Sequence, residues 1–533
     1  MEEIIITGTG SELQGVGRLA DGRAVFVPGT LLGERVRIEV TRCAQRFCEA
    51  RLIEVLEASP TRREPDCQAY GRCGGCQARH MSYAETLRCK RQRVVDALSR
   101  IGGLEAPAVR ETIGCDDPER TRNKAEFPIG RDEAGRPAIG AYAAGTRKIV
   151  PLTDCLLQRE PAVRALQWFS ENLAELRCAD HLTCLVTRVS QKGRLMLTLC
   201  ADAPILSDVQ ALVPRLTRAL PELESLYLLK QNRRPAHALD GVCTHIWGAK
   251  TLEEELMGLT FALSPQSFFQ VNSRQTENLY QCALEAAGLT DGCSASVLDA
   301  YCGVGTITLA AARLCVHAVG VEIVPPAIAD AKENARRNGL SEKTRFICAD
   351  AGEEIPRLIA RGERFDAAIL DPPRKGAEEK LLNALIQAAP ERIAYVSCNP
   401  STLARDAKIL SQGGYQLEWA QPVDMFPWSG HVETVCLLSK LQAKQHIEID
   451  LNMDELDLTD AEKKATYQEI KDYVLEHSGL KVSSLYIAQV KQKCGIIERE
   501  NYNKPKSEDA KQPQCPPDKE KAIKEALQHF GMI

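Results

Sequence analysis

Short runs of alternating polar and apolar residues dominate the first part of the chain. Arg35-Val36-Arg37-Ile38-Glu39-Val40 alternates cleanly, which places its apolar side chains on one face of a strand. Asp21-Gly22 marks a tight turn between two further strands, and residues 48–56 have the composition of another. Such closely spaced strands predict a small closed barrel of the OB type over residues 1–58, although any small β-domain shares this pattern.

The pattern is less regular over residues 59–262. Pro60 to Pro65 marks the boundary, and a cluster of cysteines follows it. Residues 83–100 then have helical spacing and several basic side chains. Strand-like and helical runs mix without a repeat beyond residue 120, so we predict a central α+β domain.

Strand-like and helical runs alternate over residues 263–440. This alternation is typical of a doubly wound parallel sheet of the Rossmann type. The chain as a whole is therefore predicted to be a multidomain α/β protein. The strand-like runs span 296–298, 318–321, 345–349, 367–370, 393–396 and 434–438.

The last segment, residues 441–533, has a different composition and a helical pattern. Gly479 separates its first two helices, and Ser483 or Ser484 could cap the second. These two helices are compatible with a helix-turn-helix motif, but a docking appendage is the simpler interpretation. The sequence does not give the role of this extension. The expected helices span 466–477, 483–495 and 519–530, with a polar linker over 505–517.

Composition limits the partners and the compartment. The 533 residues carry 67 Lys and Arg against 72 Asp and Glu, a net charge of -5, so any nucleic-acid footprint must be local. We expect no membrane span, no signal peptide and no obligate protein partner, and hence a cytoplasmic monomer. The 21 cysteines are then expected to be reduced thiols, metal ligands or nucleophiles rather than disulfides.

A glycine-rich turn follows the first strand of the α/β segment. Asp299-Ala300-Tyr301-Cys302-Gly303-Val304-Gly305 precedes a helix beginning near Thr306, and such glycines let the backbone approach a ligand. Glu322 ends the next strand and could accept from both ribose hydroxyls, while Asp350 ends the third and could accept from an adenine amine. The turn lacks the third glycine of a dinucleotide site, so the pattern favours S-adenosylmethionine over NAD.

Two further strand ends carry candidate chemistry. Asp371-Pro372-Pro373 is followed by Arg374 rather than an aromatic residue, which disfavours methylation of an adenine amine. Cys398 ends the next strand, in Val396-Ser397-Cys398-Asn399-Pro400. A thiolate that adds to C6 of uracil would activate C5 toward a methyl donor, and a base must then remove the C5 proton. Glu433 is the favoured base, and His431 is its rival.

Three cysteines lie close together after the predicted barrel. Zinc ribbons usually need two C-x2-C pairs, whereas three clustered cysteines with a distant fourth are typical of a [4Fe–4S] site. Cys155 is the candidate fourth ligand, although spacing alone leaves Cys89 and Cys115 open. The clustered three, spaced C-x5-C-x2-C, are Cys67, Cys73 and Cys76.

Taken in this order, the segments resemble the RNA uracil-C5 methyltransferases, specifically the branch acting on 23S ribosomal RNA. The resemblance covers residues 1 to about 440. Besides the motifs above, it includes Ser264-Pro265-Gln266-Ser267-Phe268-Phe269-Gln270-Val271-Asn272 and Gly430-His431-Val432-Glu433. It implies that the barrel is a TRAM domain that binds RNA, that the α/β domain binds S-adenosylmethionine, and that the target base leaves its stack.

The resemblance also implies roles for single residues. Cys398 would be the nucleophile and Glu433 the base. Cys155 rather than Cys89 would complete a [4Fe–4S] cluster that shapes the RNA-binding domain and is not redox-catalytic. Thr306 stands where some relatives carry Asn, and its hydroxyl can still bond the cofactor. The residues expected to contact S-adenosylmethionine are Gln270, Tyr301, Gly303, Thr306, Glu322, Asp350 and Asp371.

Two alternatives stay open. A transfer-RNA uracil-C5 methyltransferase would share the chemistry, but such relatives typically lack the barrel and the cluster. A non-catalytic Fe–S RNA-binding factor would need neither Cys398 nor Glu433, and S-adenosylmethionine binding separates it from an enzyme. The sequence does not specify which uridine is modified, or whether there is more than one.

Overall fold

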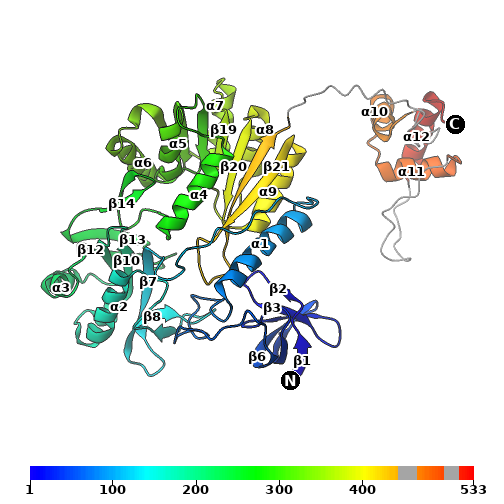
Figure 1. Ribbon diagram of the computed structural model, residues 1–533. Helices are drawn as coiled ribbons and strands as arrows, with labels where there is room; N and C mark the ends of the chain where they lie inside the picture. The colour runs from blue at the N-terminus through cyan, green and yellow to red at the C-terminus, as the bar shows by residue number, and fades with distance from the viewer. Residues whose placement is uncertain (442–464, 497–514) are drawn as a thin grey trace. The chain divides into compact units, whose positions relative to one another are not determined.

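The computed structural model describes residues 1–441, 465–496 and 515–533, which belong to two compact units (Figure 1). The first unit holds residues 1–441, and the second holds the two later ranges. Most of the linker predicted over 505–517 lies outside the described residues.

The chain begins with a six-stranded barrel, as predicted. β1 pairs with β5, and β2, which directly follows β1, pairs with β3 at the other edge, so the start of the chain joins the two edges of the sheet. Alternation in β5 turns Val36 and Ile38 inward, where both are fully buried. The strands are β1 (Glu2–Ile5), β2 (Gly8–Thr9), β3 (Gly15–Arg18), β4 (Ala24–Val27), β5 (Arg35–Cys43) and β6 (Phe47–Glu57).

The expectation that no cysteine forms a disulfide is wrong at one pair. Cys43 and Cys48 are joined by a disulfide across the β5–β6 hairpin. Their Cα atoms are 4.2 Å apart, a separation close to that of directly opposed, non-hydrogen-bonded residues in antiparallel strands. The register of the hairpin therefore brings together two thiols that the sequence presents only as neighbours. All 21 cysteines fall within the described residues, and the others are free.

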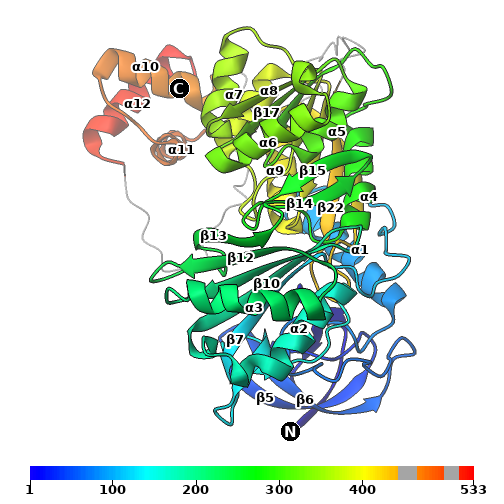
Figure 2. The same ribbon diagram turned by 90° about the vertical axis from the view of Figure 1, so that its left-hand side faces the viewer.

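The central part is α+β, as predicted. Its sheet has the order β13-β12-β11-β10-β7-β8-β9, and α2 and α3 share one hydrophobic core on it (Figure 2). The elements are β7 (Lys124–Arg131), β8 (Pro137–Tyr142), β9 (Ile149–Pro151), α2 (Glu160–Asn172), η1 (Leu173–Glu175), η2 (Ala179–His181), β10 (Leu182–Val189), β11 (Leu195–Ala201), α3 (Leu206–Ala219), β12 (Leu223–Gln231) and β13 (Gly241–Gly248).

A second seven-stranded sheet follows, with the order β18-β17-β16-β19-β20-β22-β21. A β14–β15 hairpin leads into it. The elements are β14 (Leu252–Leu256), β15 (Leu259–Leu263), α4 (Ser273–Ala286), β16 (Ser296–Ala300), α5 (Thr306–Leu314), β17 (His317–Glu322), α6 (Pro325–Arg337), η3 (Ser341–Lys343), β18 (Thr344–Cys348), α7 (Ala351–Ala360), β19 (Ala367–Leu370), α8 (Glu379–Ala388), β20 (Arg392–Ser397), α9 (Pro400–Gln412), β21 (Tyr415–Val423) and β22 (Glu433–Lys440).

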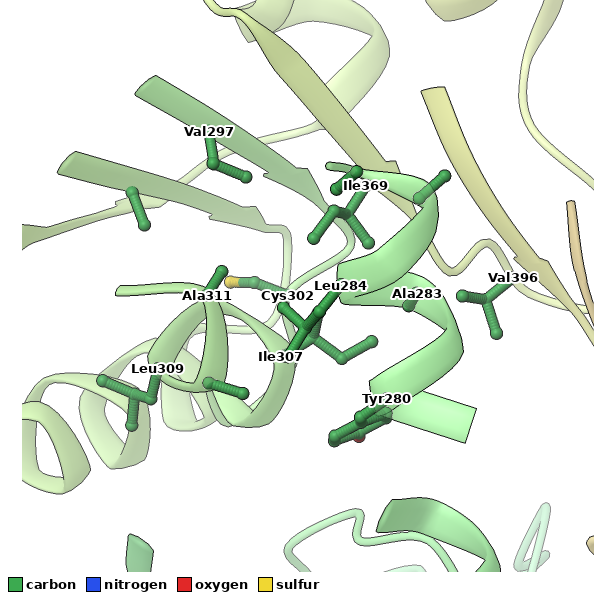
Figure 3. Packing of buried hydrophobic residues seen from close by; sticks show 14 of the residues in the cluster. Tyr280, Ala283, Leu284, Val297, Cys302, Ile307, Leu309, Ala311, Ile369 and Val396 are labelled. Carbon is green, nitrogen blue, oxygen red and sulfur yellow. The ribbon is translucent and has the colours of Figure 1, made fainter. Parts of the chain in front are cut away.

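Helices cover both faces of this sheet. Residues of α4, α5 and α6 form one core with it, and Figure 3 shows Tyr280 and Leu284 of α4 on the same side as Ile307 of α5. Residues of α7, α8 and α9 form the core on the other face. The helix predicted over 83–100 is present as α1 (Tyr83–Arg100), and its Val94 and Leu98 belong to this second core. The helix α1 falls within the residues predicted to form the central domain, but it packs on the α/β sheet instead.

The predicted doubly wound parallel sheet is confirmed from β16 to β20, but two strands at one edge are antiparallel. β21, which the sequence pattern did not predict, and β22 are antiparallel to each other, and β22 is also antiparallel to β20. The chain returns between them through a loop, residues 424–432, rather than through a crossover helix, so its direction reverses. The reversal places Glu433, the first residue of β22, at the edge where β20 ends.

The second unit contains three helices close to the predicted ranges. Thr466 and Glu469 form a reciprocal capping box at the first helix, and Ser483 caps the second. Gly479 ends the first helix with φ +68°, a left-handed conformation that favours glycine. The helices are α10 (Tyr467–Ser478), α11 (Ser484–Lys493) and α12 (Pro517–His529). Among the residues that the structure describes, none of the helices has the length and apolar character that a membrane crossing requires.

Candidate active site

The glycine-rich turn lies between β16 and α5, where the sheet order reverses. Gly305 is the N-cap of α5 with φ +83°, and a Cβ there would lie 3.0 Å from the Phe346 ring. Both the conformation and the close approach therefore require glycine. The Gly303 amide, also at positive φ, donates to Glu322 Oε2 over 3.2 Å. This bond ties the turn to the end of β17.

Five of the predicted cofactor residues line one small pocket of about 40 Å³ beside this turn: Gln270, Tyr301, Gly303, Thr306 and Asp371. Tyr280 and Phe268 line it too, two residues that the sequence pattern does not mark as cofactor contacts. Tyr280 shares a 2.7 Å hydrogen bond with Thr306, so α4 supports the first turn of α5. Phe268 is 71% exposed in the structure, and the available sequence signal was its place two residues before Gln270 in the 264–272 motif.

Glu322 and Asp350 lie at the ends of β17 and β18 but do not line that pocket. Glu322 accepts through its second oxygen from the Val324 amide over 2.9 Å. Asp350 caps α7 by accepting from the Glu353 amide. Burial raises the pKa of Tyr301 to about 12, and the negative charge of Asp350 contributes to the shift, so Asp350 lies close to the turn.

Cys398, Asp371 and Glu433 come together at the carboxyl edge of the sheet. Burial raises the pKa of Cys398 to about 11, and the charges of Glu433 and Asp371 add to the shift. Burial also raises the pKa of Glu433 to about 8, with Asp371 adding to the rise and Arg374 opposing it. The pKa of Asp371 rises to about 7 because the carboxyl group is desolvated. A buried site with three such groups favours a cation beside them.

Arg374 supplies one positive charge to this site, a role that its place after Asp371-Pro372-Pro373 does not reveal. Its charge lowers the pKa of Cys398 against the larger raising effects. Its carbonyl accepts from Asn399 Nδ2 over 3.1 Å, which joins the segment after β19 to the residue after Cys398. The rival base, His431, packs edge-on against Phe426 with ring centroids 5.8 Å apart, and burial lowers its pKa.

The four predicted cluster cysteines lie in one neighbourhood. Burial raises the pKa of Cys155, and the charges of Cys73 and Cys67 add to the shift. Burial likewise raises the pKa of Cys76 to about 11, with Cys155 among the groups that add to it. The competing cysteines lie elsewhere: the Cys115 thiol accepts from Gln275 of α4, and the Cys89 thiol contacts Glu85. Among the described residues, no three His, Cys, Asp or Glu side chains are grouped so that they could hold a metal ion.

Two family models match the chain. The tRNA (Uracil-5-)-methyltransferase model matches residues 250–441, which include the cofactor turn, Cys398 and Glu433. The TRAM domain model matches residues 2–53, which form most of the N-terminal barrel.

Relatives match over most of the first unit. An uncharacterized RNA methyltransferase of Halalkalibacterium halodurans is 40% identical over 428 residues, which are 78% of this chain and 92% of the relative. Another from Clostridium acetobutylicum is 38% identical over 450 residues, covering 82% and 97%. The crystal structure of the Pyrococcus abyssi tRNA (uracil-54, C5)-methyltransferase with S-adenosyl-L-homocysteine aligns with a TM-score of 0.65 and 25% identity, over 82% of this chain and all of that one.

Proposed function

The chain belongs to the S-adenosylmethionine-dependent RNA uracil-5-methyltransferases that carry a TRAM domain, and we propose that it methylates C5 of uridine in 23S ribosomal RNA with Cys398 as nucleophile and Glu433 as base. The carrying observation is the convergence of Cys398, Asp371 and Glu433 beside the pocket of the glycine-rich turn. Covalent methylation of C5 requires a nucleophile, a base and a bound methyl donor, and the thiol, the carboxylates and the cofactor turn can supply these functions.

In this proposal the chain's residues act in sequence on the flipped base. The Cys398 thiolate forms a bond to C6, which makes C5 nucleophilic. S-adenosylmethionine, when bound beside the glycine-rich turn, would supply the methyl group: C5 would form the new carbon–carbon bond, the methyl–sulfur bond would break, and S-adenosylhomocysteine would remain as a neutral thioether. Glu433 then removes the proton from C5, the C5–C6 double bond re-forms and the C6–S bond breaks, which returns Cys398 as a thiolate.

The electrostatics of the site suit this order of events. Because burial, and after it two carboxyl groups, raise the pKa of Cys398, the thiolate needs a positive charge nearby. Arg374 provides one, and a sulfonium would provide another. Burial raises the pKa of Glu433 to about 8 in the protein itself, and a carboxylate with a raised pKa is a stronger base for the C5 proton.

Support for ribosomal RNA comes from the resemblance of the sequence motifs, including the four-cysteine set, to the 23S branch. A second candidate substrate, transfer RNA, is favoured by the Pyrococcus abyssi neighbour, a tRNA (uracil-54, C5)-methyltransferase that aligns over 82% of this chain. The two candidates share the chemistry and differ in the RNA that the protein binds.

The experiment is adduct formation on 5-fluorouridine-substituted RNA with S-adenosylmethionine, comparing 23S fragments with transfer RNA. Fluorine cannot leave as a proton, so the enzyme should stall as a covalent complex that survives denaturation. We expect the complex with 23S RNA. A complex only with transfer RNA would overturn the substrate and keep the chemistry. No complex with either, despite cofactor binding, would overturn the covalent mechanism.

We also propose that Cys67, Cys73, Cys76 and Cys155 hold a [4Fe–4S] cluster, whose ligands are four thiolates. Two arginines support this assignment. Arg122 and Arg79 lie beside the thiols, and the Nε atoms of both are buried without a hydrogen-bond partner. A cluster with four thiolates is anionic, so the Arg122 guanidinium and the free Nε–H of Arg79, whose other nitrogens pair with Asp66 and Glu119, would face a negative charge. Since each iron takes a different thiolate, the four sulfurs need not converge on a single ion.

Loss of a ligand tests the cluster. The anaerobically purified protein should contain iron and show a broad absorbance near ~400 nm that reductant or acid bleaches. The Cys155→Ser variant should lose most of this absorbance, whereas Cys89→Ser should retain it because Cys89 contacts Glu85 instead. The reverse pattern would reassign the fourth ligand, and iron-free wild-type protein with unchanged activity would remove the cluster from the proposal.

A further inference from the structure

The loop that joins β21 to β22, residues 424–432, ends directly before Glu433. It has no regular secondary structure, yet Asp424 and Val432 at its two ends are fully buried and Trp428 in its middle is 1% exposed. Trp428 also has φ +62°, a conformation that a bulky residue holds only when its surroundings impose it. The shape of this loop, and with it the place of Glu433, is therefore set by other parts of the chain.

Lys90 of α1 holds the first end of the loop. Its ammonium group pairs with Asp424, and neither side chain is exposed. It also donates to the Phe426 carbonyl over 2.9 Å, and Tyr83, earlier on α1, donates to the other Asp424 oxygen over 2.7 Å. Moving Asp424 away from Lys90 would leave two buried charges without a partner, which is strongly unfavourable. The ion pair therefore holds Asp424 in place.

Arg93 holds the second end. It lies three residues after Lys90, on the same face of α1, and donates to the Gly430 carbonyl. Gly430 lies directly against the segment between β2 and β3, because a Cβ added there would lie 2.9 Å from the Ser11 carbonyl oxygen. The Gln77 and Ala78 amides, directly after Cys76, hold the middle of the loop by donating to the Trp428 carbonyl over 2.9 and 3.1 Å.

We propose that Lys90 and Arg93 are positioning residues that fix the β21–β22 loop at both ends and so place the Glu433 carboxylate for its proton transfer. This inference rests on the proposed role of Glu433. It gives the buried Lys90 a purpose other than RNA contact, whereas Arg88 on the same helix is half exposed and pairs with Glu85.

The proposed mechanism makes the consequence specific to one step. Carbon–sulfur bond formation and methyl transfer depend on Cys398, which follows β20, and on the cofactor turn between β16 and α5. Proton removal from C5 depends on Glu433, and a misplacement of about 1 Å can cost on the order of 100-fold in such a step. A loosened loop should thus slow the last step, and the methylated RNA should remain bonded to Cys398.

The test uses the full-length protein and RNA with ordinary uridine. For Arg93→Met we expect turnover to fall roughly 10- to 100-fold, whereas methyl transfer in a single turnover should change by less than about 3-fold. The RNA adduct that survives denaturation should accumulate. Arg93→Lys should recover most of the turnover because the ammonium group can still donate to the Gly430 carbonyl. The matched control, Arg88→Met, removes an exposed charge of the same helix and should behave like the wild type.

Equal losses of methyl transfer and turnover without adduct, in a folded Arg93→Met protein, would contradict the proposal, as would unchanged turnover. Lys90→Met is the second variant: if its melting temperature shows that it folds, it should accumulate the same adduct. Glu433→Gln separates the two inferences. If Glu433→Gln accumulates the adduct and Arg93→Met does not, the positioning role of Arg93 is wrong and the role of Glu433 stands. If Glu433→Gln does not accumulate the adduct, both roles are wrong.

Discussion

The Cys398→Ala variant should lose methyl transfer by about 10⁴-fold or more, and it should form no adduct with 5-fluorouridine RNA. Without a thiolate to add at C6, C5 of uracil remains too weak a nucleophile for the sulfonium methyl group. Cys398 is half-buried and lies outside the hydrophobic cores, so its truncation should leave the fold and cofactor binding unchanged. Methyl transfer from labelled S-adenosylmethionine and gel analysis of the adduct measure the effect.

A second cysteine provides the control. Cys348 also ends a strand of the same sheet, β18, and is exposed. The Cys348→Ala variant should therefore keep wild-type activity and adduct formation. Residual methylation in Cys398→Ala at more than about a hundredth of the wild-type rate would show that another group activates the base, and would remove Cys398 from the role of nucleophile.

The Glu433→Gln variant should accumulate the covalent RNA adduct, whereas Cys398→Ala should form none. Turnover should fall by about 10²- to 10⁴-fold, the usual contribution of a general base. The preceding steps remain possible, so the methylated RNA should accumulate on Cys398 even with ordinary uridine. Glu418 on the neighbouring β21 is exposed and serves as the control, since Glu418→Gln should leave turnover unchanged. A fall in turnover without adduct would point to His431 or another group as the base.

The same role predicts the pH dependence. Glu433 accepts a proton only when it is ionised, and burial raises its pKa to about 8. When proton removal limits the rate, turnover of the wild type should rise about tenfold per pH unit below that value and level off above it. The rise follows the ionised fraction, so it should be absent from the residual turnover of Glu433→Gln. A wild-type profile that is flat between pH 6 and 9, or that falls with rising pH, would contradict the assignment.

Local signals in the sequence determined much of this protein. Glycines, capping residues and periodicity placed α1 at its observed bounds and α10, α11 and α12 close to theirs, because these signals act within a few residues. The candidate residues of the α/β domain were found for a related reason. Parallel strands of a doubly wound sheet end at one edge, so Asp371 and Cys398, which follow consecutive strands, had to lie near each other.

Tertiary structure alone decided the remainder. The antiparallel direction of β22 brings Glu433 to the site, and it depends on pairing with β20 rather than on the composition of β22. The Lys90–Asp424 pair joins residues 334 positions apart, and a basic helical pattern does not show which of its charges turn inward. Burial in the folded chain also raises the pKa values of Cys398 and Glu433. Strand direction, long-range pairing and desolvation arise only when distant segments pack together, and so they are absent from the local pattern of the sequence.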